Sequence, residues 1–157
     1  MILHPIAPVW DARAEVLILG SFPSVASREA GFYYAHPQNR FWKLMELLFA
    51  EPVPPDAAGK RAFLLSHRVA LWDVIASCEI TGSADSTIRH AVPNDIRPLL
   101  ASGAVTRVFL NGGKAGKLYQ KYLAPSVGLE AVVLPSTSPA NAAWSLERLT
   151  QAWKCIL

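Results

Sequence analysis

Three short apolar runs, each closed by a residue typical of turns, constrain the fold of this chain more than any other feature. They are residues 15–20 (EVLILG), 106–111 (TRVFLN) and 130–135 (EAVVLP). Runs of this length without polar alternation are typical of strands that are buried on both faces. Helical patterns follow the second and third runs, at residues 112–123 and 143–156. Strands that alternate with helices predict a parallel sheet covered by helices on both faces.

The remaining segments fit the same arrangement. Further helices are predicted at residues 40–50, 57–68 and 95–102, whereas residues 69–76 (VALWDVIA) fit either a buried strand or a last helical turn. The proline-rich stretch at residues 51–56 (EPVPPD) is interpreted as a surface loop. With no linker and no internal repeat, we expect a single domain over residues 1–157.

Composition excludes several classes of protein. Hydrophobic residues make up 52% of the chain and charged residues only 17%, which excludes a disordered chain. No apolar run approaches the roughly 18 residues of a membrane span, and the first residues lack the pattern of a secretory signal, so we expect a cytoplasmic protein. Cys78 and Cys155 are too few for a disulfide framework or a four-cysteine metal site. We therefore expect chemistry without a metal or another cofactor.

The distribution of charge is more informative than its total. The formal net charge is only +3, but residues 96–129 contain no acidic residue. The same stretch contains five basic residues: Arg97, Arg107, Lys114, Lys117 and Lys121. One interpretation is a surface that attracts phosphate groups; the other is an ordinary solvated helix face.

Sheets of this kind bind ligands at the carboxyl ends of their strands, so the loops there are the place to look for function. Asn39 directly precedes a predicted helix, where its side chain can cap the first turn. The same position places an amide beside a helix N-terminus, which favours a water, a phosphate or a developing anion. The two roles are compatible.

The loop before Asn39 is rich in rings. Phe32, Tyr33 and Tyr34 could form a platform for a nucleobase, or could close the edge of the domain. His36 could act as a catalytic base, but the sequence supplies no obvious carboxylate to orient it. The alternative is that this histidine is bonded to the backbone of its own loop.

Two further loops offer polar groups. Asn111 ends a predicted buried strand, and its amide could read the lactam edge of hypoxanthine or of uracil, or could simply cap a turn. Ser136, Thr137 and Ser138 place three hydroxyls in one loop, which suits a phosphate. Because Pro139 follows, the same residues also fit the start of a helix.

Taken together, six segments resemble the DNA-deoxyinosine glycosylases, the hypoxanthine-removing branch of the uracil-DNA glycosylase superfamily. They are LILGSFPS (17–24), FYYAHPQNRFW (32–42), ALWDV (70–74), GSADSTI (82–88), FLNG (109–112) and LPSTSPAN (134–141). They occur in order over nearly the whole chain. The segment around Asn39 also resembles the F-A-H-P-x-N-R-F-W run of the mismatch-specific uracil/thymine glycosylases.

The resemblance implies a three-layer α/β/α fold with a central, mainly parallel sheet of about four strands. It also implies that a damaged base leaves the duplex and that its N-glycosidic bond is hydrolysed without a metal. The expected partners are DNA with deaminated bases and the enzymes that process abasic sites. We expect a monomer that does not associate with a membrane.

The resemblance assigns roles to individual residues. Asn39 matches the catalytic asparagine of the H-P-x-N segment and would position the water. Tyr34 matches the ring that stacks on the flipped base, and Phe22 would pack against the base. Asn111 matches the strand-end asparagine that reads uracil in other branches. The expected phosphate contacts are Ser24, Lys114, Ser136, Thr137, Ser138 and Asn141.

The chain also departs from its relatives. The mismatch-specific branch carries G-I-N-P-G in its first motif, and Phe22 stands here in place of that catalytic asparagine. The last motif offers Ala140 and Asn141 where relatives often have a bulky apolar wedge. Asp73, Ser83 and Asp85 could line the pocket or brace the sheet, and bracing is the interpretation favoured for Asp73.

Four functions remain open on the sequence. They are a deoxyinosine glycosylase, a mismatch uracil or thymine glycosylase of the same fold, a module that binds damaged DNA without cutting it, and a hydrolase of free nucleosides. No lysine lies in the motif loops, so lyase chemistry through a Schiff base is not expected.

Overall fold

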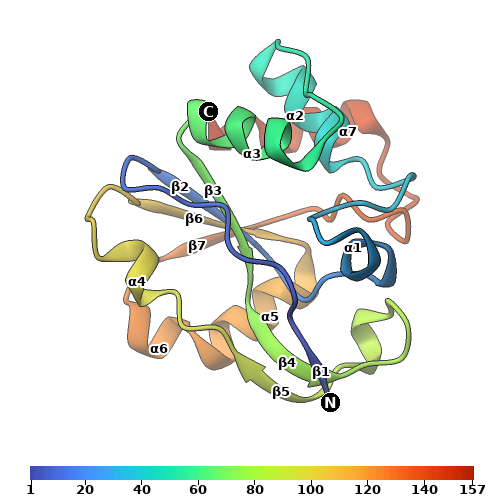
Figure 1. The fold of residues 1–157 in the computed structure, drawn as a ribbon, viewed down its shortest axis with the longest axis vertical. Coiled ribbons are helices and arrows are strands. Elements are labelled where there is room, and N and C mark those ends of the chain that lie inside the picture. Colours follow the sequence, from blue (N-terminus) through green and yellow to red (C-terminus); the bar gives the residue numbers. More distant parts are fainter.

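The computed structural model describes residues 1–157, and its centre is a sheet of four parallel strands (Figure 1). The strands are β2 (Val16–Gly20), β3 (Val69–Asp73), β6 (Arg107–Asn111) and β7 (Ala131–Leu134), in the order β3-β2-β6-β7. The three apolar runs form strands of a parallel sheet, as predicted, and the structure shows that these strands are neighbours. Residues 69–73 form the fourth strand, which excludes the helical alternative for that segment.

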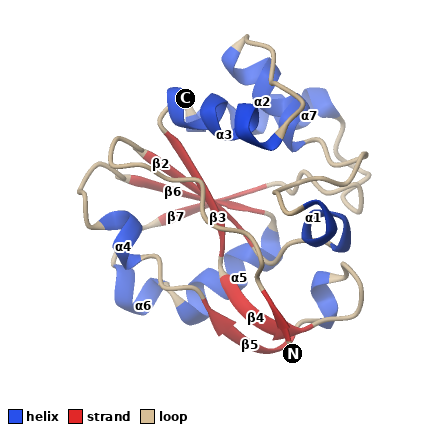
Figure 2. Cartoon of the chain, in the orientation of Figure 1, coloured by secondary structure: helices blue, strands red, loops and turns tan.

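Strand β2 shows why this sheet needs helices on both faces. All five of its residues are buried, and successive side chains point to opposite faces. Val16 and Ile18 pack in a core with the helices α2 (Phe41–Phe49), α3 (Ala57–Ser66) and α7 (Leu146–Trp153). Leu17 and Leu19 pack in a second core with α5 (Gly113–Tyr122). The expected three-layer α/β/α fold is confirmed, with one helix layer above the sheet and one below it in Figure 2.

A second, antiparallel sheet was not expected from the sequence. It contains β1 (Ile2–Leu3), β4 (Ile75–Glu79) and β5 (Arg89–Pro93), in the order β1-β4-β5. Because β4 follows β3 after the single residue Val74, one run of chain takes part in both sheets. The β4–β5 connection contains the 3₁₀ helix η1 (Asp85–Thr87) and reaches the carboxyl edge of the main sheet.

Several expected helices have different limits. The loop after β2 contains an additional helix, α1 (Val25–Ala30). The helix expected at 143–156 begins at Leu146, after the cap Ser145, and ends in η2 (Lys154–Ile156). The helix expected at 95–102 is the short α4 (Arg97–Leu100), and α6 (Ala124–Val127) follows α5.

The parallel sheet brings distant segments to one edge. Its strands end at Gly20, Asp73, Asn111 and Leu134, and the loops that follow these ends lie together. None of the helices combines the length and the hydropathy that crossing a membrane requires.

Candidate active site

A cavity of about 400 Å³ lies at the carboxyl edge of the parallel sheet. Its walls come from six parts of the chain: residues 20–27, the ring-rich loop 33–39, the strand ends Asp73 and Asn111, the segment 83–85, and the loop 136–140. Eight of the ten site residues expected from the sequence line it: Phe22, Ser24, Tyr34, Asn39, Asn111, Ser136, Thr137 and Ser138. Lys114 and Asn141 lie outside its lining.

Asn39 stands at the entrance to helix α2. Its Oδ1 accepts a hydrogen bond at 3.0 Å from the backbone N–H of Phe41, the first residue of the helix. The side chain thus satisfies a donor of the first turn, but from one residue before the N-cap position, which is Arg40. The same oxygen accepts a second hydrogen bond from the hydroxyl of Thr137 at 2.9 Å. Both lone pairs of Oδ1 are therefore used, whereas Nδ2 has no acceptor in the protein. The group that Asn39 can offer to a ligand is its NH₂, a pure donor.

Asn111 is buried at the end of β6, and its amide faces Thr137. Its Oδ1 accepts from the backbone N–H of Thr137, and its Nδ2 donates to the Thr137 hydroxyl, both at 3.0 Å. This pair of bonds occupies the amide edge that would read a lactam. For hydrogen bonds to a ligand, the Asn111 amide keeps one N–H of Nδ2 and one lone pair of Oδ1.

The side chain of Thr137, one of the residues expected to contact phosphate, lies inside the protein. The residue is fully buried, and its hydroxyl accepts from Asn111 and donates to Asn39. A side chain enclosed in this way has neither the exposure nor the free proton that a phosphate contact needs. Thr137 instead connects the two amides of the cavity.

Two aromatic rings that line the cavity pack against other rings of the protein. Tyr34 stacks on Phe41 with ring centroids 4.2 Å apart, and its backbone adopts a positive φ of 52°. Its hydroxyl is buried and makes no hydrogen bond of ordinary geometry. Burial raises the pKa of this phenol, the charge of Asp73 adds to the effect, and the nearby amide of Asn111 opposes it. Phe22 meets the ring of His4 edge to face, with centroids 5.9 Å apart. Stacking of this kind fixes the ring planes that line the cavity.

The hydroxyls of Ser24, Ser136 and Ser138 accept hydrogen bonds from backbone N–H groups of their own segments. Ser136 Oγ accepts from the N–H of Ser138, and Ser138 Oγ accepts from the N–H of Ala140, both at 3.1 Å. Ser24 caps α1 by accepting from the N–H of Ser27. The Asn141 amide donates to the carbonyl of Ser136 at 3.0 Å, so it braces the loop.

Arg40 is a residue of this site that sequence reasoning missed. Its guanidinium donates to the carbonyls of Ser138, Asn141 and Trp144, and its backbone N–H donates to the carbonyl of Thr137. Four bonds from one residue thus hold the whole loop after β7 against the start of α2. The only signal in the sequence was its place in the N-R-F-W run.

Two carboxyl groups line the cavity. Asp73 accepts from His4 Nε2 at 2.8 Å, which supports the bracing role expected for it, although it also lines the wall. Asp85 accepts from the hydroxyl of Ser21 at 2.7 Å and has no basic partner. Burial raises the pKa of Asp85, and the charge of Asp73 adds to this effect, whereas the hydrogen bond from Ser21 opposes it.

His36 is bonded to its own loop. Its Nδ1 accepts from the backbone N–H of Gln38 at 3.1 Å, and no carboxylate lies within salt-bridge distance of the ring. The backbone-bonded alternative for this histidine is therefore confirmed, and a catalytic base oriented by a carboxylate is not present here.

Comparison with known proteins identifies the family. The sequence matches the Uracil DNA glycosylase superfamily over residues 7–156. The chain belongs to the uracil DNA glycosylase superfamily.

The relatives of this superfamily member cover it almost completely. A protein of Methanosarcina acetivorans named hypoxanthine DNA glycosylase is 37% identical over 99% of this chain and 98% of its own length. A Methanosarcina barkeri protein of the same name is 31% identical over 93% of this chain and 92% of its own. The solution NMR structure of a Methanosarcina acetivorans protein named as a uracil DNA glycosylase superimposes with a TM-score of 0.83, at 35% identity, over 99% of this chain and 96% of that one.

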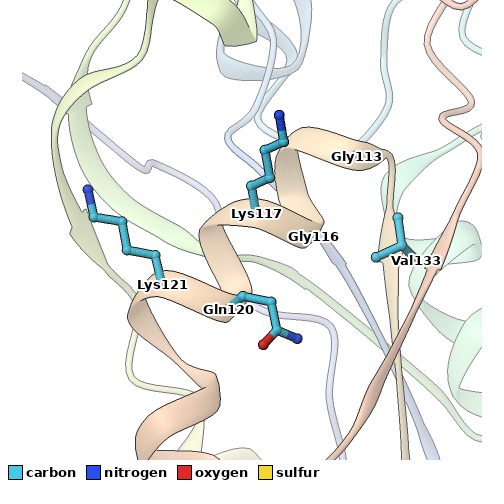
Figure 3. Close-up of a pocket in the computed structure, with 6 residues that line it drawn as sticks. All are labelled: Gly113, Gly116, Lys117, Gln120, Lys121 and Val133. Carbon is cyan, nitrogen blue, oxygen red and sulfur yellow. The ribbon is translucent and has the colours of Figure 1, made fainter.

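A second, shallow cavity of this uracil DNA glycosylase superfamily member lies along helix α5, beside β7 (Figure 3). Gly116 allows helix α5 to approach strand β7 closely, because a Cβ at this position would lie only 2.6 Å from the side chain of Val133. Lys117 and Lys121 extend from the helix to the same side in Figure 3 and are exposed. Neither they nor Lys114 form an ion pair. The acid-free stretch of the sequence therefore presents three unpaired lysines on one helix.

Proposed function

We propose that this protein is a monofunctional DNA glycosylase that hydrolyses the N-glycosidic bond of deoxyinosine in DNA, releases hypoxanthine and leaves an abasic site. The observation that carries this proposal is similarity over nearly the whole chain to proteins named hypoxanthine DNA glycosylase. The cavity is consistent with it, because stacked rings and neutral amides meet at the carboxyl edge of the sheet. This activity belongs to base excision repair.

The flipped base enters the cavity and stacks on Tyr34. One face of the Tyr34 ring already packs on Phe41, so the opposite face is left for the base. Stacking and polar contacts offset the cost of unpairing and unstacking the nucleotide, which is a few kcal/mol. Phe22 supplies a second apolar wall.

The polar groups of the cavity suit a lactam. Hypoxanthine presents O6 as an acceptor and N1–H as a donor. The remaining N–H of Asn111 donates to O6, and the free Oδ1 of Asp85 accepts from N1–H. Adenine, which has a donor in place of O6 and an acceptor in place of N1–H, mismatches both groups.

Bond cleavage leaves positive charge on the sugar and negative charge on the base. The NH₂ of Asn39 holds the oxygen of the attacking water, and fixed dipoles around it stabilise the developing charges. No lysine lines the cavity, so no covalent Schiff-base intermediate forms and the enzyme has no lyase step.

DNA phosphates flank this cavity. Ser24, Ser136, Ser138 and Lys114 contact the phosphates on either side of the flipped nucleotide, and Asn141 supports the loop that carries the two later serines. We further propose a single domain that acts as a monomer in the cytoplasm. The abasic site passes to enzymes that process such sites.

Release of free base from labelled duplexes that contain inosine or uracil tests the proposal under single-turnover conditions. Asn39→Ala should lower the rate of hypoxanthine release by about 100-fold or more. Asn39→Asp should be as slow as Asn39→Ala, because it keeps the acceptor oxygen and loses the donor. Gln151→Ala, which removes an exposed amide from α7, is the control and should match the parent protein.

A second candidate, excision of uracil, is favoured by the name of the similar NMR structure. Uracil presents O4 and N3–H in the pattern that hypoxanthine presents as O6 and N1–H, so Asn111 and Asp85 suit both bases and the relative rates of release decide between them. Faster release of uracil than of hypoxanthine would establish this alternative. Tight binding of an abasic duplex without release of any base would instead indicate a binding module, and hydrolysis of free inosine without binding to DNA would indicate a nucleoside hydrolase.

A further inference from the structure

Thr137 lies between the two amides of the cavity and bonds to both. It follows β7 in the chain and is fully buried. Its hydroxyl accepts from Nδ2 of Asn111 at 3.0 Å and donates to Oδ1 of Asn39 at 2.9 Å. The two asparagines come from different elements, the entrance of α2 and the end of β6, so Thr137 is the only direct hydrogen-bonded link between them.

Backbone donors fix the direction of every bond in this network. The N–H of Phe41 requires an oxygen of Asn39, and the N–H of Thr137 requires an oxygen of Asn111. An oxygen on Asn39 can only accept, so the single hydroxyl proton of Thr137 points to Asn39. The hydroxyl oxygen then accepts from the nitrogen of Asn111. No flipped amide satisfies the same set of bonds.

This arrangement determines what each amide can offer to a ligand. Because Phe41 and Thr137 occupy both lone pairs of Asn39 Oδ1, the NH₂ of Asn39 is left for the cavity. Because Thr137 takes one N–H of Asn111, a single N–H remains there for the base. We propose that Thr137 is a positioning residue, whose hydroxyl holds Asn39 and Asn111 in the orientations that the reaction requires.

This inference deepens the proposed function and rests on it. It differs from a purely structural role in its consequence for rate, because loss of the hydroxyl frees the Asn39 amide to rotate without removing it. Misplacement of a reacting group by about 1 Å can slow a reaction about 100-fold. Thr137 itself never contacts the water or the base.

A set of variants separates the hydroxyl from the shape of the side chain. Thr137→Val keeps the branched shape and removes the hydroxyl, whereas Thr137→Ser keeps the hydroxyl. We expect Thr137→Val to release hypoxanthine about 10- to 100-fold more slowly in single turnover. We expect Thr137→Ser to restore most of the rate. Thr150→Val, which removes a hydroxyl bonded within α7, is the matched control and should keep the rate of the parent protein.

The double variant Asn39→Ala/Thr137→Val identifies the route of the effect. Because Thr137 also holds Asn111, the double variant should be slower than Asn39→Ala, but by a smaller factor than the one by which Thr137→Val slows the parent protein. Rates that multiply, or a Thr137→Val variant as fast as the parent, would overturn the inference. A slow Thr137→Ser variant with an unchanged melting temperature would do the same.

The side-chain amide signals of the ¹⁵N-labelled protein give a readout that needs no substrate. In Thr137→Val the signals of both Asn39 and Asn111 should shift, and the bonded Nδ2 proton of Asn111 should exchange faster with water; in Thr137→Ser both should stay close to the parent. If the parent protein releases no base from any duplex, the proposed function fails. The amide signals then decide the Thr137 network by themselves, and unchanged signals in Thr137→Val would refute it.

Discussion

Nε2 of His4 donates to Oδ2 of Asp73 across 2.8 Å, and both side chains are almost completely buried. The direction follows from the other ring nitrogen, because His4 Nδ1 accepts from the N–H of Ile6 at 3.2 Å. His4, which directly follows β1, therefore holds the carboxylate of Asp73 in place. Asp73 is the last residue of β3 and lines the cavity. A buried carboxylate depends on such a partner for its stability.

His4→Ala should reduce the free energy of unfolding by about 3 kcal/mol or more, because it leaves the Asp73 carboxylate buried without its donor. His4→Gln is the control, since its terminal NH₂ can reach the position of Nε2 and should recover much of the loss. Chemical denaturation of the three proteins measures the effect. Equal midpoints for His4→Ala and the parent would show that the pair contributes nothing to stability.

Gly20→Ala should destabilise the protein by about 1–3 kcal/mol, as overpacking does in a filled interior. A Cβ at this position would overlap Oδ1 of Asp73 and come within 3.0 Å of the Tyr34 hydroxyl. Gly113→Ala, at the first residue of α5, would meet nothing within 4 Å and should be neutral or slightly stabilising. If both variants melt alike, the space around Gly20 is not as restricted as the packing indicates.

Asp85→Asn should raise the melting temperature at pH 7 while it slows hypoxanthine release. Burial raises the pKa of Asp85 above its ordinary value of 3.8, so the folded protein binds this proton more tightly than the unfolded chain. Stability from Asp85 is therefore fully present below pH 3.8 and is lost as the pH rises through the folded pKa.

An asparagine at position 85 does not titrate, so its stabilising effect should be largest at neutral pH and should vanish toward pH 3.8. Melting curves of both proteins across this pH range make the comparison. A difference that stays constant with pH would contradict the assignment to ionisation.

Lys117→Gln and Lys121→Gln should each weaken binding to an inosine duplex and reduce the steepness of its salt dependence by about one unit on a log–log plot. The reason is that each unpaired lysine of α5 would release about one counterion from the DNA. Lys154→Gln removes an exposed lysine from η2, whose carbonyls bond Arg107 at the start of β6; it is the control and should leave the slope unchanged. Identical slopes for all four proteins would exclude α5 from the DNA interface.

The central layers could be predicted from the sequence because they depend on patterns that are visible within each segment. The runs that became β2, β6 and β7 carry their own apolar signal, and the rule that ligands bind at strand ends placed the loops together. Strand β1 has two residues and helix α1 has six, which is too short for a periodic pattern. Strand β5 depends on pairing with β4, which no local pattern reveals.

Residue types in the site were easier to predict than their roles. Asn39 and Asn111 were both identified as candidates, and both line the cavity. The sequence could not show that the buried hydroxyl of Thr137 connects them, since that link depends on residues that meet only in the folded chain. His4 and Arg40 were missed for the same reason: each acts through a partner far away in the sequence.

The bonds from Arg40 to the carbonyls of Ser138 and Asn141 also bear on how the protein is made. The loop after β7 follows the other segments of the cavity in the chain, and without it Arg40 and Asn39 lack their partners. Most contacts of the central sheet likewise join residues far apart in the sequence, and such contacts form late because the intervening chain must first be closed into a loop. Assembly of the cavity therefore waits until the loop after β7 has been synthesised, and a nascent chain that stops before β7 has no competent site.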